Sequence, residues 1–529
     1  MKLKLLFALL IVTITNAQTQ IGQDIVGDMP DDNFGWGVAL SADGNVLAVS
    51  APNNDNNGTN AGHIRVYSKT SGTWTQIGQD IEGPNPDDKI GYKIVLSDDG
   101  TTLAFSAPNS KYTINNISYG GFVKVYKNIN NSWVQMGQEL REDDPMPIFG
   151  QTFGFGLSLS LSSDGTTIAI GQNNPLNYNN KVIVYKFSSG NWTKIGEISR
   201  LTHQIAQSWG YYAWNISISG DGETVALSDI TGYATGASAP ELGYVAVYKY
   251  QSGNWIKIGN TINGKSKLTV FGYRIALSEN GGVLAISVPE SDVNGTNSGH
   301  VEVYKINGNN WVQIGTDIVG EAASDNCGTG LAISANGNIL AIGCIGCDTP
   351  NGTDTGKVRV FQNIQGNWVE QGSVIGQNAG DAIGWSIALS KDGHNLAIGN
   401  YGSGSVGAKP SKNIEEQLII GDLPITNNYQ AKGSGTAGSV QVYDLSGILS
   451  SDTFVLENFN IYPNPTTDIL NIELKENLTL EKVLVYDTTG KLVKETTEKT
   501  INVSAFAKGM YNVQVVTNQG KATKKVIVK

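Results

Sequence analysis

Histidine and cysteine are scarce in this sequence, whose 529 residues include four histidines and three cysteines. The cysteines, Cys327, Cys344 and Cys347, have no patterned histidine nearby, and three thiols are too few to close a tetrahedral zinc site. Four histidines also offer few candidates for the general base that a nucleophile needs within reach. We therefore assign no catalytic residue from these two residue types.

Long apolar runs are also lacking. The run from Leu5 to Val12 is well short of the ~20 apolar residues that a spanning helix needs. It follows a basic start at Lys2 and Lys4 and precedes small residues, a pattern typical of a secretory signal peptide. We expect residues 1–17 to be this peptide, with cleavage between Ala17 and Gln18, and no transmembrane span in the mature chain. The alternative is a membrane anchor.

Positive charge is in short supply, with 36 Lys and Arg against 47 Asp and Glu, a net charge of −11. An acidic surface repels phosphate backbones, which argues against a nucleic-acid partner. We expect an exported monomer.

The chain is rich in glycine, with 64 residues, and in internal repetition. The stretch from Phe34 to Pro52 recurs seven times, at a period of roughly 56 to 65 residues. Each copy is centred on Asp-Gly or Asn-Gly, beginning at Asp43, Asp99, Asp164, Asp221, Asn280, Asn336 and Asp392.

Each repeat predicts four strands. Small and apolar residues alternate on both sides of the Asp-Gly, which predicts a hairpin with a two-residue turn and positive φ at both turn positions. A third strand ends in Val-Tyr or Val-Phe, and a fourth carries Trp-x-x-Ile-Gly or a near variant, at Trp74, Trp133, Trp192, Trp255, Trp311 and Trp368.

Six tryptophan strands serve seven repeats, and the N-terminus offers the missing one. Residues 19–25 are identical to residues 75–81, although no tryptophan precedes them. Closing a ring in this way removes the exposed edge of a linear stack of sheets. The sequence therefore predicts an all-β fold, a seven-bladed β-propeller over residues 18–447 whose N-terminal strand closes the seventh blade.

The three cysteines all fall in the sixth repeat. A turn at Asn336-Gly337 places Cys327 opposite position 346, beside both Cys344 and Cys347. An oxidising compartment then favours a disulfide from Cys327 to either of the other two. The alternative for Cys344 and Cys347 is redox or metal chemistry.

One face of the propeller is expected to carry the binding elements. The second-to-third loops and the links between blades are long and share a face, whereas the other connections are short hairpins. The longest insertion, about residues 403–437, lies on this face. Long irregular loops are often binding elements, although a bland surface insertion is the alternative.

Three second-to-third loops near residues 57–60, 294–297 and 351–354 are near copies rich in side-chain oxygens. Such loops are candidates for calcium, which prefers six to eight oxygen ligands. The weak candidate ligands are Asp55, Asn57, Asp292, Asn294, Asp348 and Asp354. The favoured alternative is that Asn and Gly make good turns, because no loop has the alternating Asp-x-Asp-x-Asp-Gly run.

Three features of the repeats carry a family resemblance: Phe-Gly at the head, Ser50-Ala51-Pro52 after the second strand, and Gly-x-Val-x-Val-Tyr in the third. Residues 18–447 resemble the FG-GAP repeats of the integrin α-subunit propeller, and are more similar still to its bacterial branch. Integrin propellers hold calcium in the first hairpin of certain blades. Here that hairpin is predicted to be too short, so those metal sites are not carried over.

After a linker at residues 448–458, residues 459–529 show alternating strands of a small β-sandwich. Its Tyr462-Pro463-Asn464-Pro465, its Gly-Met-Tyr and its basic last strand closely resemble the C-terminal sorting domain of type IX secretion in Bacteroidota. The resemblance implies recognition by that machinery and export across the outer membrane. The alternative is an ordinary adhesive β-domain.

Two classes of function remain. The favoured one is a secreted or surface-bound binding or adhesion module, with a glycan or an extracellular protein as ligand. The alternative is an enzyme acting on polysaccharide or glycoconjugate. A catalyst would show as an acid or histidine present in one repeat and pointing into the central channel; unpaired candidates are Glu290, Glu241 and His203.

Overall fold

The computed structural model describes residues 18–114, 117–141, 155–172, 180–199, 212–230, 242–266, 269–401, 437–447, 449, 455, 458–475, 478–487, 492–518 and 520–529. Several features from the sequence lie outside these residues: the expected signal peptide at 1–17 with the cleavage-site residue Ala17, the candidates His203 and Glu241, all but the last residue of the insertion at 403–437, and most of the linker at 448–458.

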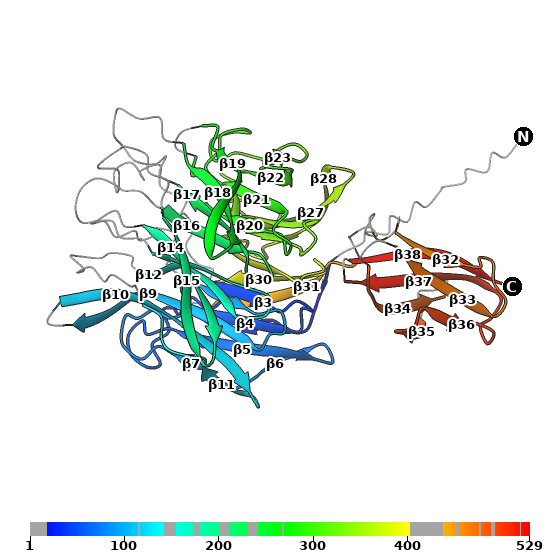
Figure 1. Ribbon diagram of the computed structural model, residues 1–529, viewed down its shortest axis with the longest axis horizontal. Helices are drawn as coiled ribbons and strands as arrows, with labels where there is room; N and C mark the ends of the chain where they lie inside the picture. The colour runs from blue at the N-terminus through cyan, green and yellow to red at the C-terminus, as the bar shows by residue number, and fades with distance from the viewer. Residues whose placement is uncertain are drawn as a thin grey trace, which may run out of the picture.

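The repeat region folds into seven antiparallel sheets (Figure 1). The first two sheets contain β3 (Gly37–Leu40), β4 (Val46–Ala51), β5 (His63–Thr70), β6 (Thr73–Gln76) and β7 (Ile81–Glu82), then β8 (Ile94–Leu96), β9 (Thr102–Ile114), β10 (Ile117–Ile129) and β11 (Ser132–Gln135). The third and fourth contain β12 (Phe155–Leu161), β13 (Thr167–Gln172), β14 (Lys181–Ser188) and β15 (Asn191–Ser199), then β16 (Tyr212–Ile218), β17 (Thr224–Asp229), β18 (Tyr244–Gln251) and β19 (Asn254–Asn263).

The remaining three sheets follow the same plan. The fifth and sixth contain β20 (Ile275–Leu277), β21 (Val283–Val288), β22 (His300–Asn307), β23 (Asn310–Gln313) and β24 (Ile318–Val319), then β25 (Cys327–Ile333), β26 (Ile339–Cys344), β27 (Lys357–Ile364) and β28 (Asn367–Ile375). The seventh combines β29 (Ser386–Leu389), β30 (Asn395–Asn400) and β31 (Ser439–Asp444) with β1 (Thr19–Gln20) and β2 (Ile25–Val26).

The seven sheets close into a ring. Each innermost strand, from β3 through β8, β12, β16, β20 and β25 to β29, contacts the next one, and β29 contacts β3. The N-terminus supplies the outer strands of the last sheet, because Thr19 pairs with Asp444 and Ile25 pairs with Val440. The architecture is therefore a β-propeller, in which each sheet is one blade.

The hydrophobic core lies between neighbouring blades. One cluster joins Phe34, Leu47 and Trp74 of the first blade to Ala397 and Val440 of the seventh, and all five side chains are buried. Burying one such aliphatic or aromatic side chain contributes about 1.5–3 kcal/mol. Because equivalent clusters fill the other gaps between blades, each blade is stabilised mainly by its neighbours in the ring.

The turn inside each first hairpin differs from the prediction. The amide of Ser41 donates to the carbonyl of Val46 at 2.9 Å, so the loop has four residues instead of two. Within this loop only Gly44 has a positive φ (69°). The Asp43 side chain forms a second turn with the backbone: its carboxylate accepts hydrogen bonds from the Ser41 hydroxyl at 2.7 Å and from the Asn45 amide at 2.9 Å. The Ser-to-Asp or Ser-to-Asn bond recurs in the other six blades.

The C-terminal region is a separate β-sandwich (orange to red in Figure 1). Its two sheets contain β32 (Phe459–Tyr462), β33 (Ile469–Leu474) and β36 (Thr500–Asn502), and then β34 (Leu480–Tyr486), β35 (Leu492–Thr496), β37 (Gly509–Thr517) and β38 (Gly520–Val528). Phe459, Val483, Val513 and Val526 meet in the core between the sheets. An all-β propeller followed by a β-sandwich is thus confirmed.

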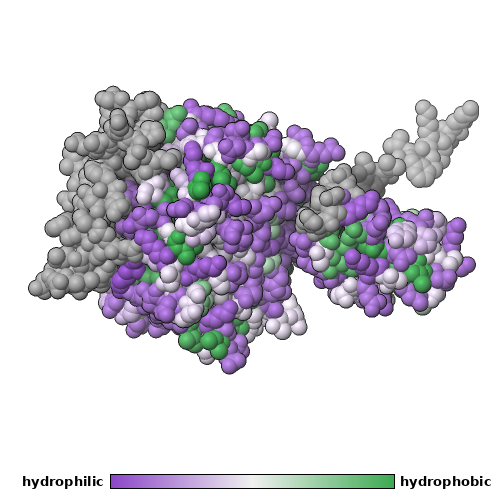
Figure 2. All heavy atoms as spheres, in the orientation of Figure 1, coloured by the Kyte–Doolittle hydropathy of each residue, from purple (hydrophilic) through white to green (hydrophobic). Residues whose placement is uncertain are grey.

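The side of the molecule seen in Figure 2 is mostly hydrophilic, with hydrophobic residues in small groups. Within the described residues, no helix is long and apolar enough to cross a membrane.

Candidate ligand-binding channel

The innermost strands surround a central cavity of about 260 Å³. All seven blades line it, with the residues of each innermost strand and those just before it. The innermost strands of neighbouring blades belong to different sheets, and polar side chains join them here. The Ser386 hydroxyl accepts a hydrogen bond from the Val38 amide at 2.9 Å, and the Ser217 hydroxyl accepts one from the Leu277 amide at 3.0 Å. The cavity therefore has a fixed wall with a few polar positions.

Aromatic side chains form the rim of this cavity at the end of the innermost strands that the links between blades enter. They occupy one repeat position, the residue after Phe-Gly or its equivalent, and we call them the aromatic rim: Trp36, Tyr92, Trp214, Tyr273 and Trp385. The ring of Trp36 lies 5.9 Å from Tyr92 and 5.5 Å from Trp385, centroid to centroid. Since long links and second-to-third loops share this end, the rim opens on the long-loop face.

The members of the aromatic rim differ in exposure. Tyr273 and Trp385 are buried, whereas Trp36, Tyr92 and Trp214 are half-buried. Tyr401, just after β30, packs against Trp36 at 5.5 Å and supports it from outside the rim. Trp36, Tyr92 and Trp214 therefore provide the accessible aromatic surface of the rim, and the two tryptophans are its largest rings.

Two cationic side chains share this end of the cavity. The guanidinium of Arg274 lies 5.3 Å from the ring centres of both Tyr273 and Trp385, and its Nε donates to the Thr329 carbonyl at 3.1 Å. The ammonium of Lys93 lies 6.0 Å from the ring centre of Tyr92. Burial, reinforced by the charge of Arg274, holds the pKa of Lys93 well below its usual value.

The opposite end of the channel is closed by the seven short hairpins. In every blade the amide of the residue after the turn serine donates to the carbonyl of its equivalent in another blade, at 2.8–3.0 Å. These bonds form one complete cycle through Ala42, Asp98, Ser163, Gly220, Glu279, Ala335 and Lys391. The cycle fastens all seven blades together at the channel axis.

A plug of polar side chains fills this cycle. Lys391 Nζ contacts the Glu279 carboxylate, lies 3.3 Å from Asp98 Oδ1 and donates to Ser163 Oγ at 2.9 Å. These partners come from three different blades, so the side chains converge on the axis. Among the described residues, the channel is thus blocked at the hairpin face, and the aromatic rim lies at its other end.

Of the sequence-predicted candidates for the channel, only Glu290 lies within the described residues. It is close enough to Tyr273 that its charge adds to the effect of burial, which raises the pKa of Tyr273 to about 12. The aromatic rim was not predicted from the sequence, although Trp36 lies in the repeated stretch from Phe34 to Pro52. The available signal was an aromatic residue after Phe-Gly or its equivalent in five of seven repeats.

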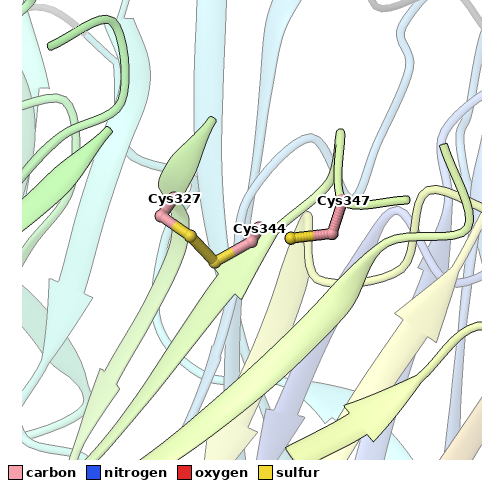
Figure 3. A group of neighbouring side chains, drawn as sticks. All are labelled: Cys327, Cys344 and Cys347. Atoms are coloured by element: carbon pink, nitrogen blue, oxygen red, sulfur yellow. A yellow bond between two sulfur atoms is a disulfide. The ribbon is translucent and has the colours of Figure 1, made fainter. Parts of the chain in front are cut away.

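Among the cysteines, Cys327 and Cys344 form the disulfide, and Cys347 is a buried free thiol (Figure 3). A bulge between Cys327 and Gly330 shifts the pairing so that Cys327 faces Cys344 directly. Burial and the neighbouring Asp325 carboxylate raise the pKa of the Cys347 thiol. In the first repeat, Asn54 and Asp32 occupy the positions of Cys347 and Asp325, and the Asn54 side-chain amide donates a hydrogen bond to the Asp32 carboxylate. Cys347 therefore takes the place of a hydrogen-bond donor with a structural role.

The candidate calcium residues serve the loops that contain them. The carboxylates of Asp55, Asp292 and Asp348 each accept a backbone amide within their own loop, at 2.7, 2.8 and 2.9 Å. Asn57 and Asn294 donate across to Gly83 and Gly320 in the next link between blades. Asp354 provides the last turn residue of its loop, with a φ of 49°. These contacts explain why the same residues recur in the three loops: they stabilise the turns.

A second cluster, His300, Glu302 and Asp317, has ligand atoms close enough for a metal ion. Lys265 already occupies it, with Nζ 2.8 Å from Glu302 and 3.6 Å from Asp317. Although burial opposes ionisation, hydrogen bonds from His300, Lys265 and Tyr304 hold the pKa of Glu302 at about 2. The cluster is best explained as a structural ion pair between blades.

Comparison with known families finds one match in each part of the chain. Residues 28–67 match the FG-GAP repeat, and residues 460–529 match the secretion system C-terminal sorting domain. The FG-GAP propeller and the type IX sorting domain expected from the sequence are therefore confirmed. The sorting domain indicates export by type IX secretion to the cell surface or the extracellular space.

Individual relatives share less with this chain. The ulvan lyase NLR42 of Nonlabens ulvanivorans is 38% identical over 81 residues, which are 14% of this chain and only 15% of that protein. A periplasmic gluconolactonase of Pseudomonas aeruginosa is 16% identical, with a TM-score of 0.42 over 67% of this chain and 91% of its own. A protein from Lactobacillus plantarum is 12% identical, with a TM-score of 0.40 over 67% and 87%.

Proposed function

We propose that the propeller is an extracellular binding module that captures a glycan at the mouth of its central channel. The observation that carries this proposal is the aromatic rim above a cavity of about 260 Å³. The flat faces of Trp36 and Trp214 suit the apolar C–H faces of sugar rings. A protein ligand usually takes about 800 Å² of surface on each partner, so the small cavity favours a glycan over an extracellular protein.

The composition of the cavity wall favours binding over catalysis. Among the described residues, its lining contains no Asp, Glu, His or Cys. Glycoside cleavage generally needs two carboxylates that flank the scissile bond, and acyl transfer needs a nucleophile beside a base. Export outside the cell agrees with a role in glycan capture.

The proposal is tested with the mature chain, Gln18 to Lys529, on an array of extracellular glycans. We expect at least one glycan to bind and its affinity to fall tenfold or more in the Trp36→Ala and Trp214→Ala variants. The control is Tyr462→Ala, which removes an aromatic side chain that is 50% exposed on the sandwich. Binding that survives both channel substitutions in folded protein would place the site elsewhere. New reducing ends in the bound glycan would instead support the enzyme.

A further inference from the structure

The charge of the cavity wall is opposite to that of the protein. The chain has a net charge of −11, yet the charged residues that line the described cavity are Lys93 and Arg274, with no acid among them. Within the described residues, neither cation has a carboxylate oxygen within 4.0 Å. Removing an unpaired cation from water costs free energy, so two such groups in one cavity need an explanation.

Arg274 is held in a fixed position, and Lys93 lies near it. Arg274 is fixed by its bond to the Thr329 carbonyl and by the aromatic rings of Tyr273 and Trp385 on which it packs. Lys93 comes from a different blade, and Arg274 is close enough for its charge to disfavour the charged form of Lys93. Both side chains are half-buried, so they keep access to the cavity. A bound anion would relieve the repulsion between them.

We propose that the captured glycan carries an anionic group, a carboxylate or a sulfate, that binds between Lys93 and Arg274 while its sugar ring packs on the aromatic rim. This inference rests on the proposed function. An arginine fork and a lysine ammonium are both common partners of such anions.

The closed end of the channel limits how the ligand enters. The plug of Lys391, Glu279 and Asp98 blocks the hairpin face, so a polysaccharide cannot thread through the propeller. A cavity of about 260 Å³ lies just below the usual range of small-molecule sites, ~300–1,000 Å³. The site therefore takes a chain end or a short branch that bears the anionic group.

Matched probes separate charge from shape. The first pair is trigalacturonate and its methyl ester, and the second is a sulfated galactose disaccharide and its unsulfated parent. Binding to the mature chain is measured by calorimetry and by tryptophan fluorescence. We expect the charged member of at least one pair to bind tenfold or more tighter at low salt, with the difference shrinking as salt rises. The pair that responds distinguishes a carboxylate from a sulfate.

Variants test the two cations. Lys93→Met and Arg274→Met should each reduce the charge preference, whereas Arg274→Lys should retain part of it and shows that the loss is not caused by misfolding. Lys305→Met, which removes an exposed lysine from the outside of β22, is the matched control and should change nothing. Thermal unfolding of every variant checks its fold.

The outcomes also separate this inference from the function on which it rests. Equal affinity for charged and neutral members, with binding that Trp36→Ala abolishes, would overturn the anionic ligand and leave the glycan-binding channel standing. A charge preference that survives the double variant Lys93→Met/Arg274→Met would place the anion elsewhere. If the folded protein binds neither these probes nor any glycan on the array, the proposed function fails as well.

Discussion

The indole N–H of Trp74 donates to the carbonyl of Ile21 at 3.0 Å, which fastens the first blade to the N-terminal strand that completes the seventh. The same bond joins other neighbouring blades, from Trp133 to Ile77, Trp192 to Met136, Trp311 to Ile258 and Trp368 to Ile314. Trp-x-x-Ile-Gly is therefore a connector: its tryptophan reaches back to the isoleucine position of the preceding copy.

Trp74→Phe should lower the free energy of unfolding by about 1 kcal/mol, because it removes the N–H and leaves the Ile21 carbonyl without this donor. The control is Trp255→Phe, since the indole nitrogen of Trp255 is buried without a hydrogen-bond partner among the described residues. That substitution should cost less than Trp74→Phe. Urea unfolding of the two variants measures the difference, and equal losses would show that the hydrogen bond contributes nothing.

The sequence predicted the repeat architecture well because each strand and turn depends on local side chains. Ser41 and Asp43, for example, recur because each turn needs their hydroxyl and carboxylate. The turn length was wrong for a related reason, since the side chain of Asp43 supplies a turn that the Asp-Gly pair alone does not reveal. The recurring Asp or Asn side chain correctly indicated a turn, but it did not reveal the backbone geometry of that turn.

Two features could not be predicted in this way. The cycle of backbone hydrogen bonds passes through Ala42, Gly220 and Lys391, whose side chains share nothing, so it leaves no pattern in the sequence. The choice of Cys344 over Cys347 depends on a bulge beside Cys327 that shifts the register of the hairpin. The convergence of Lys93 and Arg274 likewise depends on two blades that lie far apart in the sequence meeting at one axis.

Gly220 should be coupled to Glu279 in the plug. A Cβ added to Gly220 would lie 1.8 Å from Glu279 Oε1, so Gly220→Ala must displace that carboxylate from Lys391. Ala42 and Ala335 occupy the same position in their blades, which shows that the backbone itself accepts alanine. We expect a coupling of about 1 kcal/mol between Gly220→Ala and Glu279→Ala, modest because the ion pair is partly exposed. Additive effects on the free energy of unfolding would contradict this arrangement.

Cys347 should resist alkylation in the native protein. Its thiol is buried and its pKa is raised by burial and by Asp325, which leaves little thiolate for reaction. Mass spectrometry after iodoacetamide treatment should show no label on the native chain, one label in denaturant, and three labels after reduction in denaturant. A label on native Cys347 would show that this thiol is accessible and reactive, and a first label on Cys327 or Cys344 in denaturant would contradict the assigned pairing. Reduction should also destabilise the sixth blade, since closing a loop of this size contributes about 3 kcal/mol.

His63 should make the fold sensitive to mild acid. Its imidazole is fully buried, and neither ring nitrogen has a hydrogen-bond partner among the described residues. Burial, with a smaller effect from Arg65, lowers the pKa of His63 to about 4, although Asp80 and Asp28 oppose the shift. In the unfolded chain a histidine has a pKa of ~6.5, so between these two values the unfolded state binds more protons. Stability is therefore complete above about pH 6.5 and falls as the pH drops towards 4.

The expected loss over this window is about 3 kcal/mol, because each pKa unit corresponds to about 1.4 kcal/mol. His63→Phe keeps a ring that can pack against Phe34, whose own ring lies 6.3 Å away, and it removes the proton-binding group. The variant should therefore show a flatter dependence of unfolding free energy on pH between 7 and 5, where most carboxylates remain ionised. Urea unfolding across this range measures both slopes, and NMR titration of the imidazole reads the pKa directly. Equal slopes for the two proteins, or an imidazole that titrates near its ordinary value, would mean that His63 is accessible to protons in the folded state.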